Sequence, residues 1–155
     1  MSCVNDINTT AEVTTGDPDI RTKILVPFNG IFNLNQTKDI TVAVQNVGTG
    51  DTNEPIMVLF SSMYGYTVTF DTAQTTANNP AALLGNVDFT VLPFGGNLLV
   101  STNEVIPPGK ALNLGFKITA DKSGVNQIVN VSALPYTGGE TVITNNVTRI
   151  NIVSL

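Results

Sequence analysis

Short runs in which hydrophobic and polar residues alternate recur along most of this chain. Between Asp39 and Gln45 the apolar residues Ile40, Val42 and Val44 occupy every second position. Successive side chains of a β-strand point to opposite faces of a sheet, so a period of two predicts a strand with one buried face. The sequence therefore predicts a half-buried strand here.

The last third contains three further runs of β-strand character, separated by Pro-Gly, Ser-Gly and Gly-Gly or Asn-Asn punctuation. In the first run the inward positions start at Leu112 and recur at every second residue to Ile118. Val129 and Val131 continue the core in the second run, and Ile152 closes it in the third. These runs predict consecutive strands that close an antiparallel sandwich.

The segments before that third are also punctuated by turn residues. A first strand is predicted from Ile20 to Phe28, with Ile24 and Val26 on its inner face and Asn29-Gly30 as the turn that stops it. The apolar run from Pro55 to Phe60 predicts a core strand. Residues 72–84 are expected to form a long loop, and Pro93 is expected to end the strand that starts at Val87.

The pattern as a whole predicts an all-β protein. About eight to ten short strands at turn spacings of roughly 8–12 residues are typical of an immunoglobulin-like antiparallel β-sandwich. No polar linker divides the middle of the 155-residue chain. We expect an N-terminal arm, linker or edge strand over residues 1–19 and one sandwich domain over residues 20–155.

Composition indicates where such a module works. Charged residues make up 12% of the chain, about half the usual share, and the polar surface consists of Asn, Thr, Ser, Gln and Gly instead. Uncharged surfaces of this kind are common on extracellular modules. The net charge of −5 and the scattered Lys and Arg argue against nucleic-acid binding. No apolar run reaches the roughly 18 residues of a membrane span.

The chain lacks the residue types on which most catalysis depends. It has no His and a single Cys, so a serine nucleophile would have to use a lysine base, and no nucleophile motif accompanies the lysines. One Cys without His also leaves no zinc ligand set. We therefore predict that the protein is not an enzyme, and we assign no catalytic, cofactor-binding or metal-binding residues and no cofactor.

Acidic residues offer the remaining candidate chemistry. Hard oxygen ligands for calcium could come from Asp17 and Asp19, or from Asp51, Asn53 and Glu54, although neither segment has EF-hand spacing. The carboxylate pairs Asp51 with Glu54 and Asp88 with Glu104 could suggest glycosidase chemistry. Their setting beside Gly and Pro favours turn formation and solvated loop charges instead.

Two other residue types could mark surface sites. Four Asn-x-Ser/Thr sequons begin at Asn8, Asn35, Asn130 and Asn146, but such triplets arise readily in a chain rich in Asn and Thr. The three tyrosines could contact sugars or a protein partner if they are exposed; they are Tyr64, Tyr66 and Tyr136. For Tyr66 we favour core packing.

Three pieces of the sequence, taken in order, resemble one family. Asp39-Ile-Thr-Val-Ala-Val-Gln-Asn-Val-Gly-Thr-Gly is similar to the strand that begins many bacterial surface repeat domains, Ile106-Pro-Pro-Gly-Lys resembles their Ile-Pro-x-Gly turn, and Gly138-Gly-Glu-Thr with Thr144-Asn-Asn-Val resembles their final hairpin. The chain thus resembles an adhesin repeat module of immunoglobulin-like fold, of the cell-adhesion-related domain type, over roughly residues 20–153.

That resemblance implies a non-catalytic extracellular module for structure or adhesion in a bacterial surface protein or filament. Its expected partners are other proteins or like subunits, reached through sheet edges, and a surface glycan. The alternative function is a carbohydrate-binding or calcium-dependent recognition domain that uses loops 48–54 and 72–85. The arm at residues 2–19 could pair with the exposed edge of a neighbouring subunit.

The resemblance also raises the question of an intramolecular isopeptide bond. Lys23 lies in the predicted first strand, and Asn145, Asn146 and Asn151 lie in or beside the last. Lys23, however, is out of phase with the inward residue Ile24, so we expect its amine to face solvent and stay protonated. We therefore expect an ordinary surface lysine.

Overall fold

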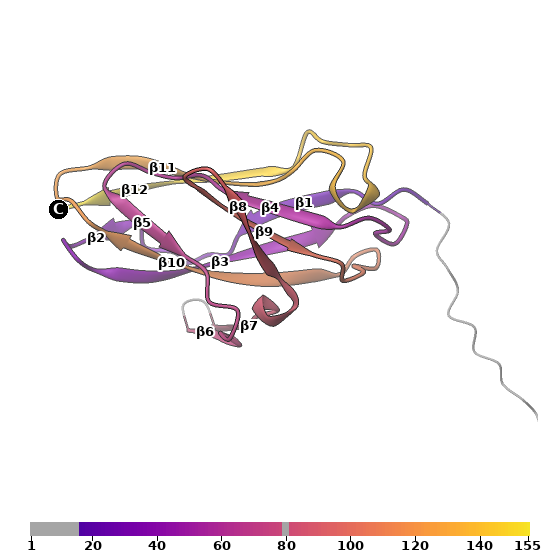
Figure 1. Ribbon diagram of the computed structural model, residues 1–155, viewed down its shortest axis with the longest axis horizontal. Coiled ribbons are helices and arrows are strands. Elements are labelled where there is room, and N and C mark those ends of the chain that lie inside the picture. The colour runs from indigo at the N-terminus through magenta and orange to yellow at the C-terminus, as the bar shows by residue number, and fades with distance from the viewer. Residues whose placement is uncertain (1–15, 79–80) are drawn as a thin grey trace, which may run out of the picture.

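The structure is a computed structural model that describes residues 16–78 and 81–155. Two sheets pack face to face as a β-sandwich whose long axis follows the strands (Figure 1). The four-stranded sheet has the order β1-β3-β10-β5, from strands Ile20–Ile24, Thr37–Asn46, Ala111–Ala120 and Tyr66–Thr69. The six-stranded sheet has the order β2-β12-β11-β4-β9-β8, from strands Ile31–Phe32, Val147–Ser154, Asn126–Ala133, Ile56–Phe60, Asn97–Thr102 and Thr90–Phe94.

The predicted fold class is confirmed. The described residues hold ten strands in the two main sheets, within the expected range. Every pairing in these sheets is antiparallel except one, because β2 runs parallel to β12. Among the same residues, no helix has the length and apolar character needed to cross a bilayer.

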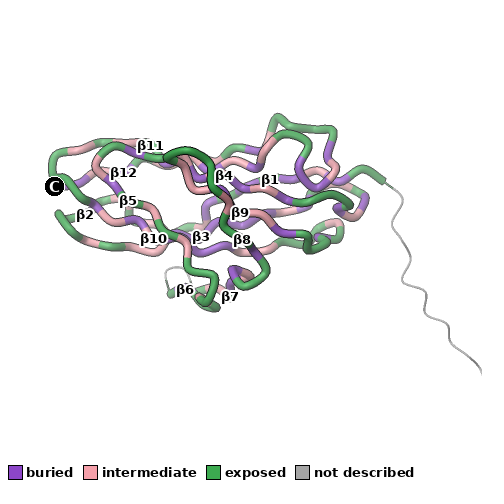
Figure 2. Tube along the Cα trace, viewed as in Figure 1, coloured by how far each residue is buried: buried purple, intermediate pink, exposed green. Residues whose placement is uncertain are grey.

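The core lies between the two sheets, as the period of two requires (Figure 2). Ile40, Val42 and Val44 of β3 face the strands of the other sheet and are buried. Phe60 of β4 and Phe116 of β10 meet across the interface, with ring centroids 5.0 Å apart. The alternating residues predicted to face inward therefore form one continuous core.

Residues 72–84 were predicted to form one long loop, but they contain a small hairpin. Strands β6, Thr76–Asn78, and β7, Ala81–Leu83, pair antiparallel and lie against the outer face of the four-stranded sheet (Figure 1). The hairpin gives β3 a second cover, so Thr41 and Ala43 are buried as well. The prediction that β3 has one solvent-facing side was wrong for this reason.

Two predicted strand boundaries were also wrong. The first strand ends at Ile24, and Val26, expected inside, is 70% exposed where the chain leaves the sheet. Pro93 does not end a strand but lies inside β8, opposite Leu98. Proline is tolerated there because β8 is an edge strand and an outward position needs no N–H donor.

Candidate functional site

Three loops gather at the end of the sandwich where β1 begins. They connect β3 to β4, β9 to β10 and β11 to β12, and hydrogen bonds join them. The Thr52 N–H donates to the Ile106 carbonyl at 3.3 Å, and the Ile106 N–H donates to the Thr52 hydroxyl at 2.8 Å. The Asn53 N–H donates to Gly138 and the Gly138 N–H to Pro55, both at 3.0 Å. This loop end is therefore an ordered surface.

A polar cluster joins the start of the first strand to the part of the β11–β12 loop that leads into the last strand. The Asn145 side-chain amide donates to Asp19 Oδ1 at 2.9 Å, and the Ile20 N–H donates to Glu140 Oε2 at 2.8 Å. The Thr22 hydroxyl donates to the Asn146 carbonyl at 2.7 Å. We call these five residues, Asp19, Thr22, Glu140, Asn145 and Asn146, the strand-bridging cluster.

Glu140 is the buried acid of this cluster, with 2% of its surface exposed. Burial raises the pKa of its carboxyl above the ordinary value near 4.5, and the charge of Asp19 adds to that rise. Hydrogen bonds from the Ile20 N–H and the Asn146 amide act in the opposite direction, because they favour the carboxylate. The net direction is upward.

Asn146 is 3% exposed, and its amide nitrogen contacts Glu140 Oε1. Its side-chain oxygen is buried and has no hydrogen-bond partner among the described residues, and the same is true of Asn145 Oδ1. A buried unpaired polar atom is costly. The cluster therefore has capacity for two further hydrogen bonds that the described residues leave unused.

The cluster also closes one edge of the sandwich. The Ile20 N–H is bonded to Glu140 rather than to the neighbouring strand, and the Ile24 N–H donates to the Thr148 hydroxyl at 3.4 Å. Side chains from the β11–β12 loop and from β12 thus take donors that an edge strand would otherwise present to a partner. This makes β1 a poor site for adding a strand.

Two of the other edges, β8 and β5, differ in how they are protected. In β8, Pro93 has no N–H, so this edge strand presents no backbone donor to another chain at that position. In the four-stranded sheet, β5 pairs only with β10 and its other edge borders a cavity. The β5 edge is therefore the more open of the two.

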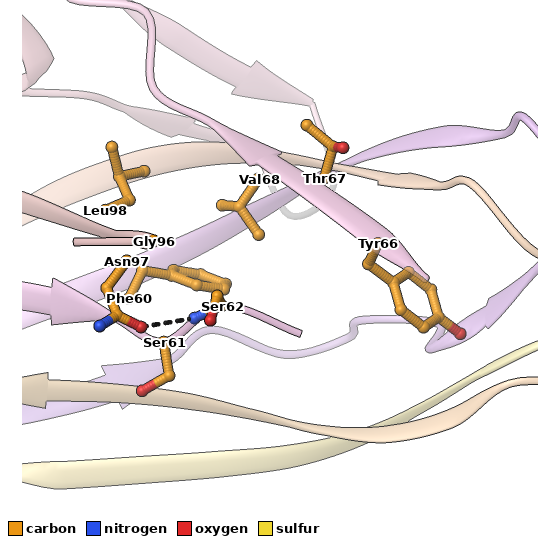
Figure 3. A pocket seen from close by; sticks show the side chains of 9 residues that line it. All are labelled: Phe60, Ser61, Ser62, Tyr66, Thr67, Val68, Gly96, Asn97 and Leu98. Atoms are coloured by element: carbon orange, nitrogen blue, oxygen red, sulfur yellow. Dashed lines mark hydrogen bonds between the residues drawn. The ribbon is translucent and has the colours of Figure 1, made fainter. Parts of the chain in front are cut away.

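That cavity has a volume of about 280 Å³ and lies between β5 and the strands β4 and β9. Figure 3 shows Phe60 and Val68 across from one another, with Leu98 further along the wall. The Ser62 N–H donates to Asn97 Oδ1 at 2.9 Å at its rim. Its lining mixes apolar side chains with hydroxyl groups, and none of the lining side chains is charged.

The calcium candidates are not brought together as carboxylate ligands. Asp17 and Asp19 use their backbone carbonyls to accept N–H groups of the β3–β4 loop, and Asp19 Oδ1 accepts from Asn145. Asn53 and Glu54 are exposed and Asp51 is half-buried. Among the described residues, no three His, Cys, Asp or Glu side chains form a group that could hold a metal ion.

The carboxylates and lysines considered for catalysis lie in ordinary surroundings. Asp88 and Glu104 are both exposed, on a 3₁₀ turn and in the β9–β10 connection. Lys117 forms an ion pair with Asp39 at 2.9 Å. Burial lowers the pKa of Lys38, whose amine donates to the carbonyls of Asn29 and Ile31 beside β2. These contacts hold strands in place.

The structure separates the sequons by accessibility. Asn35 is exposed in a turn with φ of 61°, and Asn130 is half-buried and accepts from Arg149. Asn146 is buried in the strand-bridging cluster, so a glycan could not be attached to it in the folded protein. Asn8 lies outside the described residues.

The three tyrosines have different settings. Tyr66 is buried, as favoured, and its hydroxyl donates to the Val125 carbonyl at 3.0 Å. Tyr64 is exposed and accepts from the Lys122 amine at 2.8 Å. Tyr136 is 68% exposed at the loop end, with a left-handed backbone of φ 64°. Such a φ is uncommon for a bulky residue and costs on the order of 1–3 kcal/mol.

Lys23 is exposed on β1, in the phase that the sequence indicated. The side chains of Asn145 and Asn146 face Asp19 and Glu140 instead, and Asn151 is exposed. The inward position of β1 between Ile20 and Ile24 is Thr22, which carries no amine. This placement agrees with an ordinary surface lysine at position 23.

The sequence matches no family model and no curated protein. Solved structures do resemble the fold. One is a CARDB domain from Pyrococcus furiosus in complex with di-metal ions, with a TM-score of 0.56 and 16% identity over 97% of this chain and 99% of that one. Another, two domains of the major pilin SpaD from Corynebacterium diphtheriae, has a TM-score of 0.55 and 12% identity over 86% of this chain and 50% of that one.

A third is a cohesin module of a family 33 glycoside hydrolase from Clostridium perfringens, with a TM-score of 0.51 and 14% identity over 91% of this chain and 97% of that one. Identities this low establish a shared fold and nothing finer. The immunoglobulin-like sandwich predicted from the sequence is confirmed at that level. Its neighbours include a domain of the cell-adhesion-related type that the resemblance indicated, and also pilin domains.

Sequence reasoning missed the central residues of the strand-bridging cluster. Glu140 follows Gly-Gly, and a lone acid in that setting is typical of a turn and gives no sign of burial. Thr22 gives only a weak signal, because Thr is common on both faces of strands. A usable signal was present, since Thr22 falls in phase with Ile20 and Ile24 and was therefore due to point inward.

Proposed function

We propose that this chain is a non-catalytic extracellular module that serves structure or adhesion in a bacterial surface protein or filament. The observation that carries the proposal is the placement of its ends: β1 begins at one end of the elongated sandwich and β12 finishes at the other (Figure 1). A module that is entered and left at opposite ends spans its full length between its neighbours. The low surface charge supports an extracellular setting.

Assembly with like subunits is part of the proposal. The arm at residues 2–19, of which residues 2–15 lie outside the described residues, would add as a strand to an open edge of a neighbour. The β5 edge is the candidate site for the added strand. Polar side chains occupy backbone donors of β1, and Pro93 removes a backbone donor from β8. Deletion of residues 2–15 is expected to reduce the number of subunits in the native assembly, as measured by light scattering. A chain with a shuffled arm sequence is the matched control.

The proposal is tested by locating the protein on intact source cells. Antibodies raised against residues 16–155 are expected to label non-permeabilised cells and to label any filaments sheared from them. Deletion of the coding segment is expected to weaken adhesion or filament formation without changing growth. Labelling that appears only after permeabilisation would overturn the extracellular role.

The alternative is a carbohydrate-binding domain. The observation in its favour is the uncharged cavity beside β5, which holds hydroxyl and amide groups within reach of solvent. A glycan array with the full chain tests it, and Asn97→Leu is the variant expected to abolish any signal. The calcium-dependent form of the alternative is addressed by titrating calcium in the same assay, where we expect no change.

A further inference from the structure

We propose that the strand-bridging cluster, together with the Ile24–Thr148 contact, is a mechanical clamp that resists tension along the long axis of the module. Its use as a load-bearing device rests on the proposed function. The mechanical property itself follows from the geometry of β1 and β12, and holds for the isolated chain.

The first and last strands run side by side in the same direction. Thr22 contacts Asn146 and Ile24 contacts Thr148, so a step of two residues along one strand corresponds to a step of two along the other. This parallel register places the start of β1 and the start of β12 at the loop end. The C-terminal residue Leu155 lies at the far end, where its N–H donates to Phe32.

Tension between the two ends therefore acts along the strands. A pull on Gly16 draws β1 toward the loop end, and a pull on Leu155 draws β12 the opposite way. The two strands must slide past each other, so every contact between them is loaded at the same moment. The five residue pairs between β1 and β3 are loaded in the same manner. Contacts that share a load must break together, whereas contacts between strands that are peeled apart from one end break one at a time.

Burial makes these contacts suitable for the task. Thr22, Glu140 and Asn146 are each at most 4% exposed, so water cannot replace their hydrogen bonds one by one as the strands begin to move. Sliding would separate the Thr22 hydroxyl from Asn146 and the Ile20 N–H from Glu140 before either group reaches solvent. Unpaired buried groups of this kind raise the barrier to the first step of unfolding.

The test is force-clamp spectroscopy on the full chain, held between reference modules in a Cys3→Ser background. In one geometry the chain is held at its two termini. In the other it is held at the N-terminus and at Lys110→Cys, which lies at the loop end because Ala111 pairs with Gln45 and Ile20 with Asn46. The second geometry opens the sheet from one end. We expect unfolding at the same force to be at least about tenfold slower when the termini are held.

Matched threonine variants identify the residues responsible. Thr22→Val removes a buried hydroxyl inside the clamp, and Thr52→Val removes one between two loops outside it. Loss of one buried hydrogen bond is expected to speed unfolding between the termini about tenfold for Thr22→Val and less than about twofold for Thr52→Val. Chemical denaturation of both variants shows whether their equilibrium stabilities fall by similar amounts.

Equal unfolding rates in the two pulling geometries would overturn the clamp, as would equal effects of Thr22→Val and Thr52→Val. Should Thr22→Val fail to fold, Asn145→Ala replaces it, because that side chain is only half-buried and its loss removes the bond to Asp19. A clamp measured in a protein that intact cells do not display would refute the proposed function alone. Directional resistance that is absent in a displayed protein would refute the clamp alone.

Discussion

The side-chain amide of Asn86 pairs with both backbone polar groups of Gly115. Its Nδ2 donates to the Gly115 carbonyl and its Oδ1 accepts the Gly115 N–H, each at 2.9 Å. β5 pairs with β10 only from Lys117 onward, so Gly115 has no strand on that side. Asn86 supplies the missing ladder bonds and at the same time donates to the Asp71 carbonyl at 2.9 Å. One buried side chain thus extends the edge of a sheet.

Replacing Asn86 is expected to be costly. Asn86→Ala leaves buried N–H and C=O groups at Gly115 unpaired, which should lower the free energy of unfolding by about 2–4 kcal/mol. Asn86→Asp is expected to destabilise as well, because an ionised carboxylate cannot donate to Gly115 or Asp71. Urea denaturation measures both variants. Asn113→Ala, which removes a more exposed bond to Leu83 at 3.3 Å, should cost less than about 1 kcal/mol.

The sequence allowed the strands and the core to be predicted because both follow a local rule, the alternation of side chains across a strand. Every second residue from Ile40 to Val44 and from Leu112 to Ile118 packs in or against the core, as expected. The β6–β7 hairpin escaped prediction because its Ala and Asn residues carry weak strand propensity, and it forms where β3 and β10 offer a surface to cover.

The strand-bridging cluster escaped for a different reason. Its contacts join residues that are more than a hundred positions apart, such as Ile20 with Glu140 and Thr22 with Asn146. Which turn-forming Asn and Glu become buried depends on how the loops fold over the end of the sandwich. No periodicity encodes that choice, so the burial of Glu140 and Asn146 could be found only from the structure, whereas the phase of Thr22 with Ile20 and Ile24 was visible in the sequence.

Glu140 should make stability depend on pH. Because its folded pKa lies above the ordinary value, the native state retains the proton longer than the unfolded state as pH rises. The stability that the protonated Glu140 contributes is fully present below about pH 4.5 and is lost as pH rises through the folded pKa. Glu140→Gln stays neutral at every pH, so it does not lose stability in this way. Its side-chain amide can donate to Asn146 Oδ1 if the side-chain amide of Asn146 rotates by half a turn.

The measurement is the free energy of unfolding of wild type and Glu140→Gln from pH 4 to pH 8. The variant should gain stability relative to wild type as pH rises across this range. A difference that is constant with pH, or that shrinks, would contradict the assignment of Glu140 as an acid with a raised pKa. Glu104→Gln, at an exposed position, is the matched control and should show no such gain.

Pro93 is expected to protect the β8 edge from other chains. Pro93→Thr restores an outward N–H on a strand that already presents the half-exposed side chains of Val91 and Phe94. A continuous row of donors and acceptors is a template for strand pairing. The variant should therefore associate in sedimentation velocity at concentrations where wild type does not, with stability changed by less than about 1 kcal/mol. Pro107→Thr, in an exposed turn, should leave association unchanged.

Tyr136 keeps an exposed aromatic ring at the loop end at the cost of a strained backbone. Asn adopts the left-handed region more readily than Tyr, so Tyr136→Asn is expected to raise the free energy of unfolding by about 0.5–1 kcal/mol. Tyr64 has an equally exposed ring, but its backbone φ is not positive. Tyr64→Asn removes the contact of this ring with Lys122, so the substitution should be neutral or mildly destabilising. From this strain at an exposed residue we infer the hypothesis that the Tyr136 ring takes part in binding. Thermal unfolding compares the stabilities of the two variants. An adhesion assay on displayed protein should show weaker adhesion for Tyr136→Asn despite its higher stability. A stabilised Tyr136→Asn variant with full adhesion would show that the ring has no part in binding.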